Sequence, residues 1–550
     1  MYRKNLNQTF PRVAYFCMEY GLHEEFQIYA GGLGILAGDH LKTAGDLGLP
    51  LVGIGILWRY GYTNQFIGSD GRPYDVFPEL HYDFLKDTGV KVKVNIQGEE
   101  TVCRIWMTDK YGNAPLYLLD TNLPENKHAW VTGHLYGGNA ETRIAQEIVL
   151  GIGGVRALRA LGIDVDVYHF NEGHAALAGI ELIREKMEEG FTFDEAWEAT
   201  RKEIVFTTHT PVLAGNESHN MGTLEYMGAF NGLTREEMSL IGGDPFNMTV
   251  AGLRLARIAN GVAQLHGVTA RKMWKHVNQA APIIAITNGV HVPSWQDPRI
   301  KEAYEAGKDL WNVHMQIKKE MLEEVKARTG IELNPEALTI GFARRAAPYK
   351  RANLIFQNPA IIDPLLRSGR IQLIFAGKAH PQDELGKNIV ASVVAMTRRY
   401  PQSVVFLENY DMKIGRILTR GCDVWMNNPR RPQEASGTSG MKAAMNGVLN
   451  FSVLDGWWPE GCVHGVTGWQ IGGGYEGPGQ DEHDLYHLHK VLTEEVIPTY
   501  YENRPRWLEM MKASIRMSHY QFSTERMVKE YYDRMYLPAE EYWKQVAAGK

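Results

Sequence analysis

Several features are scarce in this sequence, and each scarcity argues against a class of protein. Cysteine is rare in the 550 residues and widely spaced, at Cys17, Cys103, Cys422 and Cys462. These positions have neither the paired spacing of a zinc site nor the density of a disulfide-stabilised secreted domain. We therefore predict free thiols in a reducing compartment, the cytoplasm, and no bound metal.

Long apolar runs and a strong net charge are also missing. Nowhere do about 18 apolar residues follow one another, which predicts that the chain does not span a membrane. The formal charge is −6, from 58 basic and 64 acidic residues, so no overall field attracts nucleic acid or an anionic membrane. An anionic substrate must therefore be bound by a local concentration of basic residues.

Short apolar runs alternate with helical patterns along the whole chain, which predicts an α/β protein with parallel sheets flanked by helices. Strands are predicted within residues 12–20, 50–58, 165–170 and 203–210, and again within 337–344, 371–379, 403–410, 423–428 and 448–456. Helices are predicted within residues 31–48, 141–162 and 192–202.

The two series of strands predict two Rossmann-like, doubly wound domains, residues 1–290 and residues 291–550. The domains should face a central cleft, with ligands bound where the carboxyl ends of the strands meet it. The segment from residue 481 on is helical in pattern and rich in Tyr and Trp, and we expect it to pack across both domains.

Two motifs are suited to bind anions. In "YAGGLG", residues 29–34, Gly31 and Gly32 can bring backbone N–H groups close to an anion at a helix N-terminus. In "ARRAAPYKR", residues 343–351, four cations follow an apolar strand: Arg344, Arg345, Lys350 and Arg351. Taken alone, the first motif also fits a tight turn and the second a solvated surface patch.

A third motif, "EASGTSGMKAAMNG", spans residues 434–447 and places one lysine, Lys442, at a helix start. The helix dipole disfavours a cation there, so the amine is expected to have a chemical partner. The preceding turn offers hydroxyl and N–H groups from Ser436, Gly437, Thr438, Ser439 and Gly440. This pattern is suited to a lysine that forms a Schiff base with pyridoxal phosphate, although an ordinary helix-start lysine is the alternative.

Polar residues also stand at otherwise apolar strand ends: Asn171, His174, His209 and Asn288. Such side chains bind sugars, but each histidine taken singly also fits a hydrogen-bonded position in the core.

In their order, these motifs resemble the glycogen, starch and maltodextrin phosphorylases, the pyridoxal-phosphate-dependent α-glucan phosphorylase family, in a short bacterial or archaeal-type form. Residues 434–447 resemble the cofactor-lysine signature, and "ARRAAPYKRANL" resembles the K-R-x-x-x-Y-K-R phosphate loop. "FLENYDMKIG", "ITNGVHVPSW", "TTHT" and "GGLGILAGDHL" resemble further segments of that family. The likeness extends from about residue 12 to about residue 460.

The resemblance implies a GT-B fold and the reversible phosphorolysis of α-1,4-glucans such as glycogen, starch or maltodextrin. The product would be α-glucose 1-phosphate, formed with retention of configuration. The implied cofactor is pyridoxal phosphate on Lys442, near Arg344, Thr438, Ser439 and Gly440. The implied partners are glucan, phosphate and glucose 1-phosphate, with neither nucleic acid nor membrane; assembly into a homo-oligomer stays open.

The resemblance also implies roles in substrate binding. Arg345 and Lys350 would bind the substrate phosphate, helped by backbone N–H groups of the Gly31–Gly32–Leu33 turn. The 3-hydroxyl of the glucosyl unit would contact Glu434, Ser436 and Gly437. Its 6-hydroxyl would contact Asn288 and its 2-hydroxyl Tyr349, with His209 orienting the ring.

Two departures from the family pattern stand out. "NPRRPQEASG" brings two additional arginines, Arg430 and Arg431, to the approach to the cofactor signature. "LYGGNAETRIAQE", residues 135–147, is shorter than the loop that guards the site in longer members.

Two other functions compete with a phosphorylase. A nucleotide-sugar-dependent glucan synthase shares the two-lobed fold and a basic donor site, but it needs no cofactor lysine. A non-catalytic glucan-binding protein of the same fold would have no use for the set formed by Lys442, Arg345, Lys350 and Glu434.

Overall fold

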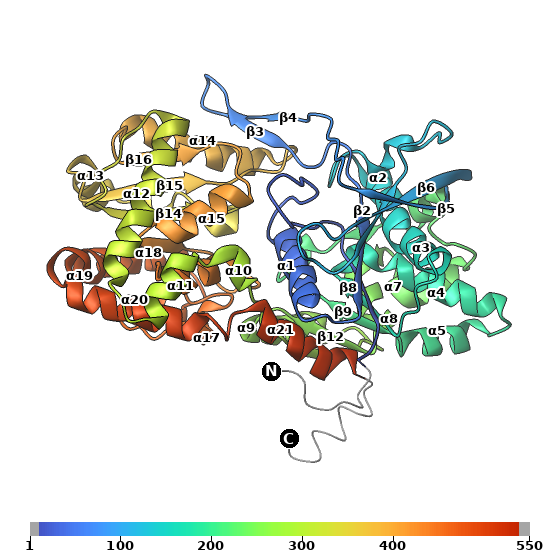
Figure 1. Cartoon of the computed structure of the whole chain (residues 1–550). Helices are drawn as coiled ribbons and strands as arrows, with labels where there is room; N and C mark the ends of the chain where they lie inside the picture. The colour runs from blue at the N-terminus through green and yellow to red at the C-terminus, as the bar shows by residue number, and fades with distance from the viewer. Residues whose placement is uncertain (1–9, 538–550) are drawn as a thin grey trace, which may run out of the picture.

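The structure, a computed structural model, describes residues 10–537 and consists of two lobes, each built around its own β-sheet (Figure 1). The first sheet has nine strands. In spatial order they are β13 (Ile283–Ala285), β12 (Ile258–Gly261), β9 (Ile204–Thr207), β8 (Val167–Asn171), β1 (Val13–Phe16), β2 (Leu51–Ile56), β7 (Leu116–Asp120), β6 (Glu99–Thr108) and β5 (Lys86–Ile96). Neighbours from β13 to β7 are parallel, whereas β6 and β5 form an antiparallel edge.

The second sheet has six strands, all parallel. In spatial order they are β16 (Val404–Leu407), β15 (Ile371–Ala376), β14 (Leu338–Ala343), β17 (Val424–Asn427), β18 (Leu449–Val453) and β19 (Gly468–Ile471). Every strand range expected from the sequence contains a strand, which confirms the α/β class and the two parallel sheets.

Side chains on successive positions of the second sheet enter two different cores. Along β15, Leu373 and Phe375 belong to one hydrophobic cluster, while Ile374 and Ala376 belong to another. Because side chains alternate across a strand, both faces of this sheet are covered. A sheet covered on both faces requires near-continuous apolar strands, and this pattern made the strands recognisable in the sequence.

Helices fill the connections between the strands. In the first lobe they are α1 (Gly32–Asp46), α2 (Ala140–Glu147), α3 (Gly154–Ala160), α4 (Leu177–Glu188), α5 (Phe193–Arg201), α6 (Met221–Met227), α7 (Arg235–Gly242), α8 (Met248–Leu255) and α9 (Gln264–Trp274). From residue 292 on they are α10 (Val292–Trp295), α11 (Pro298–Glu305), α12 (Leu310–Thr329), α13 (Pro359–Arg367), α14 (Glu384–Arg399), α15 (Met412–Gly421), α16 (Ser439–Met445), α17 (Trp458–Gly461), α18 (Gln480–Val491), α19 (Ile497–Glu502), α20 (Arg504–Ser518) and α21 (Thr524–Tyr531). None of the helices between residues 10 and 537 combines the length and apolar character needed to cross a membrane.

The last helix, α21, returns to the first lobe and packs below α1 (Figure 1). Met527 and Val528 of this helix are fully buried in the core that also contains β1. In the turn after α21, the Tyr536 hydroxyl hydrogen-bonds to Nδ1 of His169 on β8, at 2.7 Å. The segment from α18 to α21 therefore contacts both lobes. The two sheets place the division between Ala285 and Leu338, and the boundary at residue 290 stays a prediction.

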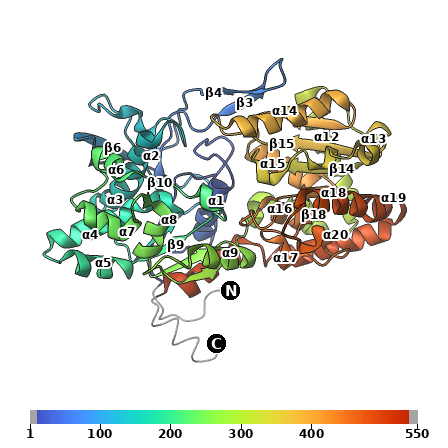
Figure 2. The same ribbon diagram turned by 180° about the vertical axis from the view of Figure 1, so that it is seen from behind.

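A second connection between the lobes is the hairpin of β3 (Asn64–Ile67) and β4 (Pro73–Val76). It leaves the first lobe and crosses the top of the molecule to reach α14 (Figures 1 and 2). Gln65 Nε2 donates to the Ala379 carbonyl at 2.9 Å, and Lys387 of α14 forms an ion pair with Asp75 at 2.8 Å. The cleft between the lobes is thus bridged at both ends of the molecule.

Candidate active site

A cleft of about 510 Å³ lies between the lobes, where the carboxyl ends of parallel strands from both sheets face each other. Its walls include the start of α1, the ends of β8, β9 and β14, and the turn before α16. Most of the residues expected from the sequence line it: Gly31, Gly32, Leu33, His209, Asn288, Arg344, Arg345, Lys350, Glu434, Ser436, Gly437, Thr438, Ser439 and Lys442. Four expected residues of the described chain, Asn171, Arg351, Gly440 and Tyr349, do not.

Gly440 lies behind the cleft wall, at the start of α16. A Cβ atom there would come within 2.6 Å of Asn450 Oδ1 and 2.8 Å of Trp457 Nε1, so only glycine fits. The glycine lets α16 approach the core closely, and its contact with a cofactor stays a prediction. Tyr349 is half-buried beside Lys350, whose ammonium lies 5.1 Å from the centroid of its ring. Its contact with a sugar hydroxyl stays a prediction.

Lys442 extends from α16 into the cleft in an unusual environment. Its ammonium lies 3.8 Å from the centroid of the Trp295 ring, and no carboxylate in residues 10–537 forms an ion pair with it. Burial lowers the pKa of Lys442 to about 8; Asp39 opposes this shift and Lys42 adds to it. A buried amine that deprotonates readily is suited to a covalent bond with a carbonyl compound.

A cluster of buried charged residues, Arg344, Lys350 and Glu434, lies beside the turn before α16. Glu434 forms ion pairs with Arg344 and with Lys350, whose Nζ is 3.3 Å from Glu434 Oε2. Burial disfavours ionisation of Glu434, but Arg344 and Lys350 outweigh it and lower the pKa of this carboxyl group. Burial also lowers the pKa of Lys350, with Arg344 adding to the shift. The Glu434 carboxylate thus compensates the charge of two cations, and an incoming anion can replace it as their partner.

Four buried polar atoms of residues that line the cleft have no hydrogen-bond partner within residues 10–537: His174 Nδ1, Glu217 Oε2, Asn288 Oδ1 and Ser436 Oγ. Buried polar atoms are nearly always hydrogen-bonded, so unpaired ones in a cleft indicate where a polar ligand binds. His209 has its partner already, since its Nε2 hydrogen-bonds to Asn171 Oδ1 at 2.5 Å. Burial lowers the pKa of His209 to about 3, so this ring is neutral near pH 7.

The glycine-rich turn before α1 already binds an anion from the chain itself. The carboxylate of Glu19 accepts hydrogen bonds from the N–H groups of Ala30 and of Gly31, the latter at 3.3 Å. Burial raises the pKa of Glu19 to about 7, and these N–H donors oppose the shift. The N–H of Gly31 is therefore engaged. Phosphate binding by Gly31, Gly32 and Leu33 stays a prediction.

Several residues that line the cleft were not expected from the sequence: Glu19, Tyr62, Tyr136, Arg143, Glu172, Lys378, His380 and Tyr410. Lys378 follows β15 just as Arg344 and Arg345 follow β14. Its position after a strand could therefore have indicated from the sequence that it lines the cleft. Lys378 donates to the Thr63 carbonyl of the other lobe at 2.7 Å, and burial lowers its pKa to about 8. Glu19 follows β1 and offered the same signal, whereas Tyr62 gave none, because only the tertiary fold brings it to the cleft.

Comparison with known proteins gives a consistent result. A family model described as carbohydrate phosphorylase matches residues 296–458, a range that contains the charge cluster and Lys442. The chain is 42% identical to a maltodextrin phosphorylase of Thermococcus litoralis, over 96% of this chain and 70% of the relative. It is 39% identical to a glycogen phosphorylase of Mycobacterium tuberculosis, over 98% and 72%, respectively. It is also 35% identical to a glycogen phosphorylase of Aquifex aeolicus, over 95% and 86%.

Proposed function

Because this chain belongs to the carbohydrate phosphorylase family, we propose that it is an α-1,4-glucan phosphorylase of GT-B fold. It transfers the terminal glucosyl unit of glycogen or maltodextrin to inorganic phosphate and forms α-glucose 1-phosphate, with retention of configuration. The observation that carries this function is the position of Lys442. Its buried amine shares one cleft with Arg344, Arg345 and Lys350.

Lys442 and its neighbours fit pyridoxal phosphate. The lowered pKa of Lys442 supplies the neutral amine that bonds to an aldehyde, and Trp295 offers an aromatic surface beside it. Thr438 and Ser439 line the cleft at the start of the same helix, where the helix dipole favours a phosphate. When bound, the cofactor supplies a second phosphate group that can exchange a proton with the substrate phosphate.

Arg345 and Lys350 bind the substrate phosphate in this proposal. Lys350 needs only to exchange its contact with Glu434 for one with the phosphate, so the anion enters a site whose cations are already in place. Released from one of its two cations, the Glu434 carboxylate can accept a hydrogen bond from a sugar hydroxyl. Substrate phosphate and glucosyl unit are therefore bound by the same cluster, and this favours binding of both together.

The glucosyl unit is bound by groups that lack a partner in the free enzyme. Asn288 Oδ1 is placed to accept a hydrogen bond from one of its hydroxyls, and Ser436 Oγ is placed to accept or donate one. Neutral His209, fixed by Asn171, borders the same space and orients the ring without adding charge. We place the enzyme in the cytoplasm, which the four free cysteines support.

The reaction itself tests the proposal. The purified protein, incubated with maltoheptaose and inorganic phosphate, is expected to release glucose 1-phosphate, followed by phosphorus NMR, with the α configuration confirmed by proton NMR. Shortening of the glucan with free glucose as product, or without consumption of phosphate, would show a different reaction.

The cofactor has its own test. Borohydride reduction followed by peptide mapping is expected to find the pyridoxyl group on Lys442. Lys442→Ala is expected to fold, to contain no pyridoxal phosphate and to lack phosphorolysis. Lys413→Ala, at an exposed lysine of α15, is the matched control and should keep the cofactor. A pyridoxyl group on any other lysine contradicts the assignment.

A further inference from the structure

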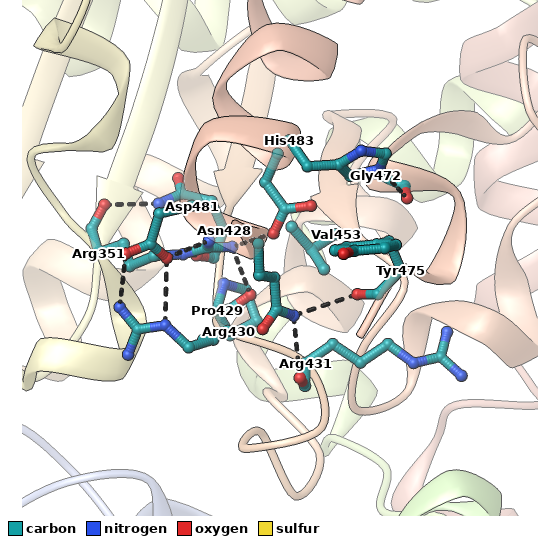
Figure 3. Close-up of polar contacts among 12 residues, drawn as sticks. Arg351, Asn428, Pro429, Arg430, Arg431, Val453, Gly472, Tyr475, Asp481 and His483 are labelled. Atoms are coloured by element: carbon teal, nitrogen blue, oxygen red, sulfur yellow. Dashed lines mark hydrogen bonds and ion pairs between the residues drawn. The ribbon is translucent and has the colours of Figure 1, made fainter. Parts of the chain in front are cut away.

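Hydrogen bonds join the phosphate loop, residues 343–351, to residues 428–431, which precede the turn before α16 (Figure 3). Each segment donates bonds to the other. Asn428 Nδ2 donates to the carbonyl of Lys350 at 3.2 Å and to that of Arg351 at 2.5 Å. In return, the Arg351 side chain donates to the carbonyls of Asn428 and Pro429, each at 2.8 Å. Arg351 is 4% exposed, so these bonds lie within the protein interior. The backbone on the C-terminal side of Lys350 is thereby fixed.

Asp481, in the first turn of α18, connects this pair of segments to a third (Figure 3). Its Oδ1 lies 3.0 Å from Nη1 of Arg351 in the phosphate loop. The same carboxylate accepts two bonds from Arg430, at 3.1 and 3.0 Å. The backbone N–H of Arg430 donates to the Tyr349 carbonyl at 2.7 Å. One carboxylate thus binds both segments that border Lys350.

This network gives a structural role to one of the two arginines that depart from the family pattern. Neither Arg430 nor Arg431 is among the described residues that line the cleft. Arg430 binds Asp481, whereas Arg431 binds Glu476 at 2.9 Å and the Leu454 carbonyl at 3.0 Å. Arg430 therefore reaches the phosphate loop through its backbone and through Asp481, and Arg431 does not.

We propose that Asp481 is a positioning residue for substrate phosphate: by binding Arg351 and Arg430 together, it fixes where the Lys350 ammonium lies. The proposal rests on the function proposed above, because it assumes that Lys350 binds the phosphate of the reaction. Asp481 itself is nearly half exposed and lies outside the cleft, so it touches neither substrate nor cofactor. Its effect is specific to phosphate, because the two segments that it joins are those on either side of Lys350.

The test is Asp481→Asn in the cofactor-loaded enzyme. The variant keeps the size of the side chain but loses the charge that binds two guanidinium groups. KM for phosphate and for glucose 1-phosphate is expected to rise about tenfold, the loss typical of one charge-assisted hydrogen bond. KM for maltodextrin should stay within about twofold, because Asn288, Ser436 and His209, which are proposed to bind the sugar, make no contact with Asp481.

Two further variants separate positioning from general damage. Asp481→Glu keeps the carboxylate and is expected to restore most of the phosphate affinity. Glu476→Gln breaks the exposed ion pair with Arg431, which does not reach the phosphate loop, and should leave both KM values unchanged. An unchanged phosphate KM in Asp481→Asn, or an equal rise for maltodextrin, overturns the inference. Absence of phosphorolysis in the unmodified protein would instead refute the proposed function.

Discussion

At the scale of single residues, the site consists of ionisable groups buried beside one another. Lys442 has an aromatic ring next to its ammonium instead of a carboxylate, while Lys350 shares Glu434 with Arg344. The sequence indicated Lys442 because a lone lysine after a glycine-rich turn is unfavourable without a ligand. It could not indicate Trp295, since the tryptophan lies far away in the chain and reaches Lys442 only through the fold.

The first prediction concerns the pH dependence of cofactor binding. Only the neutral amine of Lys442 can attack an aldehyde, and its pKa is lowered to about 8 in the folded protein. Uptake of pyridoxal phosphate by the apoprotein should therefore fall about tenfold per pH unit below pH 8 and level off above it. Absorbance of the bound cofactor, followed over time at each pH, measures this. A rate that still rises toward pH 10.5 would mean an ordinary, solvated lysine.

The second prediction separates phosphate binding from glucan binding. Arg345→Ala and Lys350→Ala each remove a cation from the cleft, and Lys350→Ala also leaves Glu434 with one cation only. Affinity for phosphate and glucose 1-phosphate should weaken by on the order of 2–5 kcal/mol, far more than affinity for glucan. Initial rates with each substrate varied in turn provide the comparison. Arg367→Ala, at an exposed arginine of α13, is the control, and equal losses for both substrates would indicate a folding defect.

At the scale of elements, the sequence indicated many of the strands that are buried on both faces, but it missed the largely buried β7 and β12 as well as the half-exposed β5. Strand β14 is an uninterrupted apolar run and was expected. In strand β5, Val92 and Val94 are buried, whereas Lys91 and Lys93 point to solvent. Such an edge strand has no continuous apolar run, and its position becomes fixed only by pairing with β6. The β3–β4 hairpin was missed because its partners lie in the other lobe.

The third prediction tests that hairpin as a connection between the lobes. Gln65 donates to the Ala379 carbonyl and accepts from the Ala379 N–H, each at 2.9 Å. Gln65→Ala removes these partners of the buried N–H and carbonyl groups of Ala379, which should lower the free energy of unfolding by about 2 kcal/mol. Chemical denaturation measures the loss, and the Ala379 amide should exchange its hydrogen faster. Tyr74→Ala, at a half-exposed residue of the same hairpin, should change neither; an unaltered Ala379 amide in Gln65→Ala would contradict the role.

At the scale of the whole molecule, the cleft exists only because two sheets face each other. Strand ends can be located in a sequence, so Arg344, Lys350 and His209 were expected at the cleft. Hydrogen bonds between the two lobes cannot be located in the sequence in this way. Lys378 of the second lobe bonds to Thr63 of the first, and His380 bonds to the Tyr136 carbonyl at 3.0 Å. These contacts depend on how the lobes dock, which local pattern does not encode.

The last prediction concerns the glucosyl donor, because it separates a phosphorylase from a glucan synthase of the same fold. The cleft has about 510 Å³, and pyridoxal phosphate on Lys442 would occupy the part lined by Thr438 and Ser439. The remaining space then admits phosphate or glucose 1-phosphate but excludes the diphosphate and base of a nucleotide sugar. The enzyme should extend maltodextrin from glucose 1-phosphate, release phosphate, and run in reverse when phosphate is in excess. ADP-glucose and UDP-glucose at matched concentration should give no extension, as measured by chromatography of the glucans. Elongation from either nucleotide sugar, with glucose 1-phosphate ignored, would refute the phosphorylase and favour the synthase.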